Sequence, residues 1–583
     1  MSTTLQRPPA VAPTTTSRGT MLRRLRRRGG AIALVSALAL VLWGYVVAPM
    51  VATVRTSLTG EDGSSLAEYS RFFSGGATTR ALFGSIGISV ASVVTSALLG
   101  TALAILFARS EFPMKRLCQV LVLVPIALPP LMGVEAFVLL YGEGGAVPQA
   151  LAQLLGGAQT EYAVKGVGGV LLVHTLTMYP YFYLSVAASL GSADDSLEEA
   201  ALSLGASRTT TWRRVLLPML TPAVVAGALL TFMSSMASYT APLLFNYDNV
   251  LTRQIVLAQV NNERQFAATI STVLALVSIA FLIAMRYWEQ RRVYRSTSKG
   301  GGRRLARVTS PFAKAVTTVV ALVASLILLS PILMIAVMAF AEDGSWTTTI
   351  LPASYTWEHM TTLFTDANAW TPVVTSLQMS AIAVGGAVLL GVLSAYALTR
   401  YQFRTRWLLD IAVMLPWALP ATVVAINLIT AFAGPNPFAL GQVLVGTFAI
   451  VPLAYFVRFS PLVFRSTSAS LAQLDPSIED AARSLGASWL YAFRRVVLPL
   501  LAKGIFAGAL LAFVDGVGEF VASILLYTPS SRPLSIAISD ELYQAHFGTA
   551  SVYGLIQVAL VIGALAFSQR LGGRVGSRAV SMI

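Results

Sequence analysis

The chain has 583 residues, of which 55% are hydrophobic and only 11% are charged, and it carries a formal net charge of +15. Soluble domains contain roughly 25% charged residues, so this composition excludes an ordinary water-soluble protein and predicts a chain surrounded by lipid. The basic net charge by itself favours a nucleic-acid partner, but the positions of the charges argue against one.

Apolar segments of about 20 residues recur along the chain, each long enough to cross a hydrocarbon layer of about 30 Å as a helix. The first follows the basic stretch RRLRRRGG and is longer than a signal h-region of about 7–15 residues, so it is predicted to be a retained anchor. We predict an all-α polytopic protein with twelve spans: 31–54, 81–108, 117–141, 167–190, 219–240, 266–286, 315–340, 373–398, 407–433, 442–463, 504–527 and 547–568. The expected parts are a basic cytoplasmic tail (1–30), a first half (31–288), a cytoplasmic linker (289–313), a second half (314–568) and a C-terminal tail (569–583).

The charges follow the predicted topology. Of the 41 Lys and Arg residues, 33 lie in segments on one side of the membrane and seven in segments on the other. By the positive-inside rule this predicts that both termini lie in the cytoplasm. We therefore expect the lipid bilayer, and no nucleic acid, as the partner of the basic residues.

The two halves repeat one pattern. Residues 85–135 align with 376–426 at a constant offset of 291, so that Pro129 matches Pro420, and beyond the third span the offset becomes 281. Each half then has six spans in the same orientation, which is a parallel repeat. The basic, Gly/Ser-rich stretch between the halves favours a flexible linker.

Two similar polar stretches interrupt the apolar pattern, EEAALSLGAS at 198–207 and EDAARSLGAS at 479–488. Each follows the fourth span of its half, so both are predicted to face the cytoplasm. A serine with an acidic residue three positions later has the form of a capping box, a glycine stops the helix, and the next serine can cap a second helix. The residues in these roles are Ser196 with Glu199, Gly205 and Ser207, and Ser477 with Asp480, Gly486 and Ser488. The acidic first turn and small alanines predict a docking element for a partner with a basic pocket.

The longer segments EAALSLGASRTTTWRRVLLP (199–218) and DAARSLGASWLYAFRRVVLP (480–499) resemble the EAA loop of binding-protein-dependent ABC importer permeases, with Asp480 as the one departure from the pattern. A single chain with two such halves resembles the fused permeases of the ferric-iron transport family. This resemblance implies the type I permease fold, two ATP-binding cassette subunits and an extracytoplasmic substrate-binding protein as partners, and loops that seat in the ATPase subunits. The coupling residues that it implies are Glu198, Glu199, Ala200, Ala201, Gly205, Glu479, Asp480, Ala481, Ala482 and Gly486.

The sequence offers no enzyme site of its own. None of the five lysines is followed by Ser or Thr, so a phosphate-binding P-loop is excluded, and ATP and Mg²⁺ are expected on the partner subunits with no cofactor on this chain. The three histidines, His174, His359 and His546, lie in different segments without metal-ligand spacing, so neither a catalytic group nor a metal site is expected.

Carboxylates inside predicted spans are the candidates for a translocation path, because charges are costly in hydrocarbon. Asp515 and Glu519 are four residues apart and are expected to share a helix face. The candidates, with the polar residues that match or neighbour them in the repeat, are Glu135, Asn427, Ser234, Ser238, Asp515 and Glu519. We expect either an acidic route between the halves for a cation or a metal species, or structural pairing with a residue such as Arg458.

Several alternatives remain open from the sequence. Alternating access by an ATP-driven importer of ferric iron is the first expectation; 2-aminoethylphosphonate, thiamine or a polyamine fits the same layout. An ion-coupled secondary transporter also uses six-plus-six repeats but needs no duplicated docking helices. The outer segment 341–372 carries four acidic residues and no Lys or Arg, so it either receives the binding protein or is a solvated loop.

Overall fold

The computed structural model describes residues 18–60, 63–64, 66–192, 200–291, 310–346 and 349–573. Most of the expected N-terminal tail, most of the linker (292–309), the end of the C-terminal tail, and Ser196, Glu198 and Glu199 lie outside these residues. The described residues are helical, apart from turns, one isolated bridge and a hairpin of two-residue strands, β1 (Thr59–Gly60) and β2 (Gly63–Ser64). The predicted all-α fold class is confirmed.

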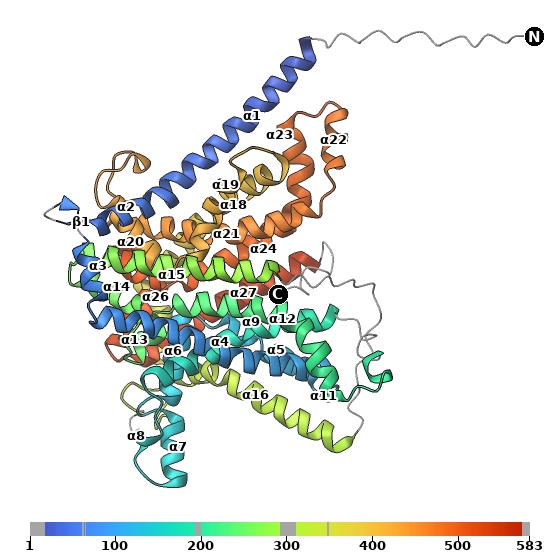
Figure 1. Cartoon of the computed structure of the whole chain (residues 1–583). Helices are drawn as coiled ribbons and strands as arrows, with labels where there is room; N and C mark the ends of the chain where they lie inside the picture. Colours follow the sequence, from blue (N-terminus) through green and yellow to red (C-terminus); the bar gives the residue numbers. More distant parts are fainter. Residues whose placement is uncertain are drawn as a thin grey trace, which may run out of the picture.

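The first half begins with a continuous helical run of α1 (Arg18–Leu42), η1 (Trp43–Val47) and α2 (Ala48–Leu58), seen in blue in Figure 1. Its other elements are α3 (Ala67–Phe73), α4 (Ala77–Arg109), α5 (Lys115–Leu121), η2 (Val124–Ala127), α6 (Pro130–Tyr141), α7 (Ala146–Leu155), α8 (Gln159–Tyr162), α9 (Gly166–Ser192), α11 (Arg208–Thr211), η3 (Trp212–Leu216), α12 (Leu217–Met236), α13 (Thr240–Leu244), α14 (Leu251–Val260) and α15 (Arg264–Arg291).

The second half repeats this order. Its elements are α16 (Pro311–Met338), α17 (Glu358–Thr365), η4 (Ala367–Trp370), α18 (Thr371–Arg400), α19 (Arg406–Ala418), α20 (Ala421–Phe432), η5 (Pro437–Ala439), α21 (Ile450–Ala472), α22 (Pro476–Ser484), α23 (Trp489–Ala492), η6 (Phe493–Val497), α24 (Leu498–Gly518), α25 (Val521–Leu526), η7 (Pro529–Ser531), α26 (Leu534–Tyr543) and α27 (Phe547–Gly573). The last two helices start 283 residues after α14 and α15, so the repeat extends to the end of each half.

The third span of each half is bent sharply in two. Helices Lys115–Ile126 and Pro130–Leu155 meet at 108°, and α19 meets α20 at 113°. Leu128 and Leu419 have extended backbone before Pro129 and Pro420, because a proline disfavours helical geometry in the residue that precedes it. Nine single helices in the described part of the chain are long and apolar enough to cross a membrane, and the two bent pairs bring the number to eleven.

Three further expectations about the spans need correction. The tenth span was predicted at 442–463, but α21 occupies Ile450–Ala472 because residues 445–449 form turns that include Gly446 at a φ of 83°. The fifth and eleventh spans end earlier than predicted, at Met236 and Gly518. Asp515 and Glu519 therefore do not share a face of one continuous helix, since Glu519 lies in extended backbone between α24 and α25.

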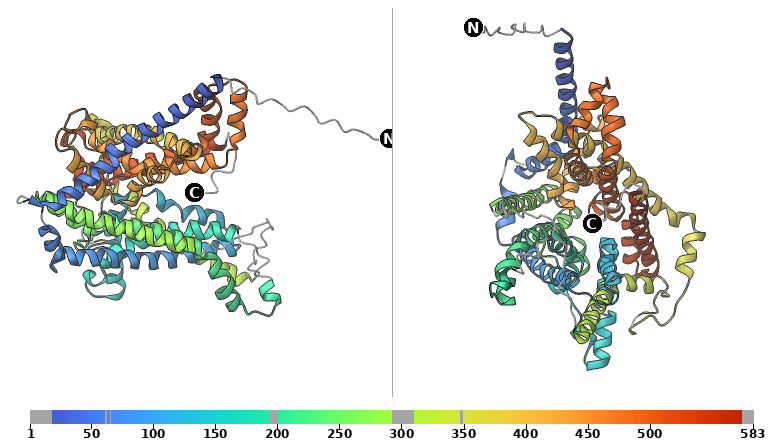
Figure 2. Two further views of the ribbon diagram at one scale, coloured as in Figure 1. Left: turned by 45° about the horizontal axis from the view of Figure 1, so that its top comes forward. Right: turned by 90° about the vertical axis from the view of Figure 1, so that its right-hand side faces the viewer.

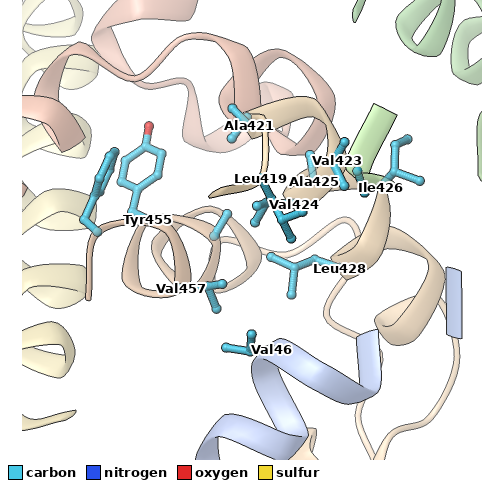
Figure 3. Packing of buried hydrophobic residues seen from close by; sticks show 14 of the residues in the cluster. Val46, Leu419, Ala421, Val423, Val424, Ala425, Ile426, Leu428, Tyr455 and Val457 are labelled. Carbon is cyan, nitrogen blue, oxygen red and sulfur yellow. The ribbon is translucent and has the colours of Figure 1, made fainter. Parts of the chain in front are cut away.

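The two halves exchange their bent spans. α6 packs against α16, α26 and α27 of the second half, and α20 packs against α2, α14 and α15 of the first. Figure 3 shows Val46 of η1 beside Leu428 of α20 and Val457 of α21, all three buried in one apolar cluster. This exchange holds the halves together by apolar burial that neither half provides alone.

Matching contacts position matching helices in both halves. The Ser85 hydroxyl accepts the Leu251 N–H at 2.9 Å, and Ser376 accepts the Leu534 N–H at 2.7 Å. Both coupling segments lie at one end of the molecule, the right-hand end in Figure 1, and Figure 2 shows them on separate halves.

Candidate functional site

The second coupling helix, α22, begins two residues earlier than the predicted capping box. Its N-cap is Asp475, whose carboxylate accepts the Ser477 N–H at 2.9 Å, and Pro476 takes the first helical position. Ser477 and Asp480 lie within the helix, so the prediction that they form its cap is wrong. The backbone N–H and the hydroxyl of Ser477 hold the pKa of Asp475 below its usual value.

Both coupling segments end in the same way, as predicted from their glycines. Gly205 and Gly486 have φ angles of 84° and 92°, which favour glycine. The next residues, Ala206 and Ala487, donate to the carbonyls of Ala201 and Ala482 at 3.0 and 3.2 Å, which is the 6→1 bond of a Schellman stop.

The predicted caps of the following helices are confirmed. The Ser207 hydroxyl accepts the Thr210 N–H at 3.2 Å, and Ser488 accepts the Tyr491 N–H at 3.3 Å. Each following helix then passes through a π-helical turn, η3 or η6, at positions 281 residues apart. Both segments are therefore joined to the membrane helices that follow them by the same backbone geometry, a serine cap and a π-helical turn.

Glu479 anchors α22 to the membrane helices. It is 7% exposed, accepts a hydrogen bond from the Tyr396 hydroxyl at 2.6 Å, and lies 3.6 Å from the Arg400 guanidinium. The Trp489 indole in turn donates to the Tyr396 hydroxyl at 2.9 Å. The Glu479 carboxylate thus faces inward, whereas its neighbour Asp480 is exposed.

The outer surface of each coupling segment is apolar. Leu204 is 88% exposed and Leu485, the matching residue, is 90% exposed. Ala200 and Ala481 are exposed beside them, and Ala201 and Ala482 are half-buried. Two almost fully exposed leucines at matching positions are unfavourable in water, and they indicate a surface that another protein covers.

A charged group lies at the break between α24 and α25. The Arg458 guanidinium is 3.1 Å from Glu519 Oε2, and Glu519 Oε1 accepts the Ala522 N–H at 3.0 Å. The Glu519 carbonyl accepts hydrogen bonds from Ser523 at 2.7 Å and Ser535 at 2.8 Å. Glu519 is 7% exposed and makes the pairing with Arg458 that was one of the two expectations from the sequence.

Asp515 lies one helical turn before the break and is exposed within the chain. In the first half, Ser234 of α12 donates to the Tyr181 hydroxyl of α9 at 3.3 Å. Within the described residues no hydrogen bond or ion pair joins Asp515 to Ser234, so these two path candidates lie in different halves without a direct contact.

The first half carries a neutral network at the matching place. His174 Nε2 is 2.9 Å from the Ser238 hydroxyl, and its Nδ1 is 2.9 Å from Ser92 and 3.2 Å from Ser235. The Ser238 carbonyl accepts from Thr252 at 2.7 Å, as the Glu519 carbonyl accepts from Ser535. Ser238 is thus a structural member of this network.

Two matching aromatic residues meet between the halves. Tyr239 and Phe520 occupy equivalent positions just after the two breaks, are 3% and 1% exposed, and have ring centroids 6.3 Å apart. Equivalent residues of two rotationally related halves can touch only close to the axis that relates them. This contact therefore lies near the pseudo-twofold axis.

The remaining path candidates lie apart from this group. Glu135 in α6 and Asn427 in α20 are 6% and 5% exposed, and within the described residues no hydrogen bond or ion pair joins either of them to Arg458 or Asp515. The described residues also hold no cluster of three or more His, Cys, Asp or Glu side chains that could bind a metal ion.

The comparison with known families agrees with this architecture. The family model of binding-protein-dependent transport system inner membrane components matches twice, at residues 100–294 and 387–577. The chain therefore belongs to this family, and it is an ABC importer permease rather than an enzyme. Members of the family are polytopic inner-membrane proteins that work with ATPase and binding-protein partners.

Individual relatives cover most of the chain. The probable ABC transporter permease y4fN of Sinorhizobium fredii is 31% identical over 84% of this chain and 85% of its own length. The ferric transport system permease FbpB of Actinobacillus pleuropneumoniae is 24% identical over 91% of this chain and 76% of its own. A protein of Salmonella paratyphi A, named as a 2-aminoethylphosphonate transport system permease, PhnV, is 31% identical over 39% of this chain and 84% of its own.

Proposed function

We propose that this permease imports ferric iron, which an extracytoplasmic binding protein delivers, by alternating access driven by two separate ATPase subunits that bind ATP and Mg²⁺. The observation that carries the proposal is the similarity to FbpB, a ferric transport permease, along 91% of the chain. Oxygen-bearing side chains within the spans of both halves, Tyr181 and Asp515 among them, support it, because hard cations favour oxygen ligands.

The geometry supports different functions for the two ends of the molecule. The coupling segments present matched apolar surfaces at one end, which we assign to the ATPase subunits in the cytoplasm. Tyr239 and Phe520 meet on the axis between the halves, and Asp515 lies in α24 one helical turn before the break that precedes Phe520. A rocking of the halves that separates the two rings opens a route to the outer side.

A second cargo is favoured by one specific observation. The PhnV relative matches part of the chain, and the Arg458 guanidinium offers a cation to a phosphonate. Because Glu519 already pairs with this guanidinium, ferric iron remains the first proposal and a phosphonate is an outcome of the test.

The test is uptake by proteoliposomes that contain the permease and its ATPase subunits, with the binding protein supplied outside. We expect ATP-dependent accumulation of labelled Fe³⁺, and a loss of about tenfold with Asp515→Asn at unchanged assembly, since a charge that contacts cargo contributes at least about 1.4 kcal/mol. Ser330→Ala, at a half-buried serine of α16, is the control.

Three results would contradict the proposal. Accumulation of 2-aminoethylphosphonate but not iron would transfer the cargo to the second candidate. Uptake that persists without the ATPase subunits and collapses with an ion gradient would identify a secondary transporter. Unchanged iron uptake by Asp515→Asn would remove this residue from the path.

A further inference from the structure

A cavity of about 220 Å³ opens in the second half between α17, η4, α26 and α27. Its lining includes the carboxylates of Asp366 and Glu541, the Arg532 guanidinium and the Tyr553 ring. It lies far from the coupling helix, because α18 starts at Thr371 beside the cavity and runs for 30 residues, about 45 Å, to Arg400, which contacts α22. The cavity thus opens at the end of the molecule opposite to the ATPase-binding surface.

The first half shows what fills the matching space there. Arg71 of α3 places its guanidinium 3.9 Å from the centre of the Phe266 ring in α15, and its Nη2 is 2.9 Å from Glu263. The helices correspond residue by residue, since α3 and α17 start 291 residues apart and α15 and α27 start 283 apart. An arginine of the chain itself is therefore bound at this position of the fold in the first half, stacked on an aromatic ring and paired with a carboxylate.

The second half replaces the arginine and its partners: histidines, His359 and His546, stand at the positions of Glu68 and Glu263, and the cavity holds two other carboxylates, Asp366 and Glu541. Thr362 stands at the position of Arg71 and Thr549 at that of Phe266, and both line the cavity. Replacement of a guanidinium and a phenyl ring by two threonines removes the atoms that fill the space in the first half. The segment 341–372 contains no Lys or Arg that could refill it.

The charges around the cavity favour a cation. Of its two carboxylates, Glu541 lies 3.0 Å from His546 Nδ1, and the guanidinium in the lining, Arg532, is 3.1 Å from Asp540 outside it. Asp366 accepts the Asn368 N–H at 2.9 Å and, within the described residues, has no cationic partner. His359 is held by the Ala341 carbonyl at 3.0 Å and by Thr549 at 3.3 Å. A side chain with a planar cationic end matches these groups better than a neutral one.

We propose that this cavity is the docking site for an arginine side chain of the extracytoplasmic binding protein, which supplies from outside the guanidinium that Arg71 supplies within the first half. This assignment rests on the proposed function, because it takes its occupant from the delivery step. The docking is asymmetric: the second half receives the partner's side chain, and the first half presents a surface that its own arginine has already closed.

The charge preference can be measured without the binding protein. Cys118 is buried, so a cysteine at Thr362 is the reactive thiol of a Thr362→Cys permease, and Thr361→Cys on the same helix, outside the cavity lining, is the matched control. The probes are the cationic 2-aminoethyl and the anionic 2-sulfonatoethyl methanethiosulfonates. We expect the cation-to-anion rate ratio at 362 to exceed that at 361 by about threefold to tenfold, and to fall to the control ratio with Asp366→Asn and Glu541→Gln. Equal ratios at the two positions would overturn the cation preference.

The occupant is tested in the assembled complex with the binding protein that stimulates its ATP hydrolysis. The double variant Thr362→Arg with Thr549→Phe places in the second half the two side chains that fill the matching space of the first. We expect it to reduce the stimulation of ATP hydrolysis by the binding protein about tenfold, with unchanged basal ATP hydrolysis. The control, Thr361→Arg, should have little effect. Glu541→Gln, which adds no bulk, tests the same point, and replacement of one surface arginine of the binding protein by Gln should reproduce the loss. Full stimulation of both permease variants would overturn the docking site alone. A wild-type complex that no binding protein stimulates would contradict the proposed function and the docking site with it.

Discussion

The two halves solve the same structural problem with different chemistry. In each, a membrane helix breaks, and the carbonyl at the break, that of Ser238 or Glu519, accepts a hydrogen bond from a hydroxyl group of α14 or α26. In the first half a histidine bonds the Ser238 side chain, whereas in the second an arginine pairs with the Glu519 carboxylate. The duplicated backbone therefore fixes where polar groups are needed, and the side chains that diverged decide whether they carry charge.

The same contrast recurs at the outer end. Arg71 closes the surface of the first half, and the two threonines at matching positions leave the second half open. At the coupling end, by contrast, the two segments share their glycine stops, serine caps and exposed leucines. The two ATPase subunits of the proposed mechanism require matching surfaces there, whereas the single cargo and single binding protein of that mechanism require none elsewhere. The proposed number of partners at each level therefore accounts for where the chain is symmetric and where it is not.

The largest expected effect comes from removing the ion pair between Arg458 and Glu519 at the break of the second half. Arg458→Ala leaves Glu519 buried without its cation and should destabilise the protein by about 3 kcal/mol, whereas Ser238→Ala, which removes a neutral hydrogen bond, should cost about 1 kcal/mol. Thermal unfolding in detergent measures both. Arg458→Ala with Glu519→Gln should recover part of the loss, and equal destabilisation by the two single variants would mean that the charge on this break is unimportant.

The next effect tests whether both coupling segments are needed. Gly486→Val and Gly205→Val should each reduce transport-coupled ATP hydrolysis by about tenfold, because a side chain at a φ near 90° costs about 1–2 kcal/mol of backbone strain and shifts the leucine that follows the helix. A Cβ at either glycine meets no atom within 4 Å, so the effect is one of backbone conformation and not of a clash.

The control for the coupling segments is Gly385→Ala, at a helical glycine that is also open. Loss with one glycine variant and full activity with the other would show that one ATPase contact is sufficient, and the symmetry of the coupling end would then have no functional meaning.

A smaller effect is expected at the contact between the halves. Phe520→Ala and Tyr239→Ala each remove one ring of the pair, and we expect either change to allow a slow, ATP-independent leak of small ions through proteoliposomes. The two variants should leak to a similar extent, since the residues are equivalent. Phe567→Ala, at an exposed aromatic residue of α27, should not leak. Tight vesicles with both ring variants would place the barrier elsewhere.

The sequence predicted those features of the structure whose physical cause lies within a few residues of the chain. The repeat, the glycine stops and the caps of Ser207 and Ser488 rest on backbone chemistry within a few residues, and the structure confirms them. The bends at Pro129 and Pro420 had a local signal in these prolines, although the apolar run concealed it.

Tertiary causes could not be predicted in this way. The apolar stretch 504–527 continues past Gly518, and the break there is fixed by hydrogen bonds to Glu519 from α25, α26 and Tyr455 of α21. The partner of Arg458 depended on the position of α21, which the predicted span misplaced. The outer cavity exists because threonines in the second half stand at the positions of Arg71 and Phe266 in the first. Only the structure shows that Arg71 and Phe266 touch.

The smallest expected effect concerns the cap of α22 and its dependence on pH. Hydrogen bonds from Ser477 lower the pKa of Asp475 in the folded protein, so the cap contributes stability that is fully present above the unfolded pKa of an aspartate, about 4, and is lost as the pH falls through the lower folded value. Hydrogen exchange of the α22 amides in wild type and Asp475→Asn, compared at each pH so that intrinsic rates cancel, should show greater protection in wild type near neutrality and a difference that vanishes as the pH falls below the lowered folded pKa. Because asparagine keeps the acceptor and does not titrate, a difference that stays constant with pH would assign the protection to shape alone, and the second coupling helix would then owe nothing to the charge of its cap.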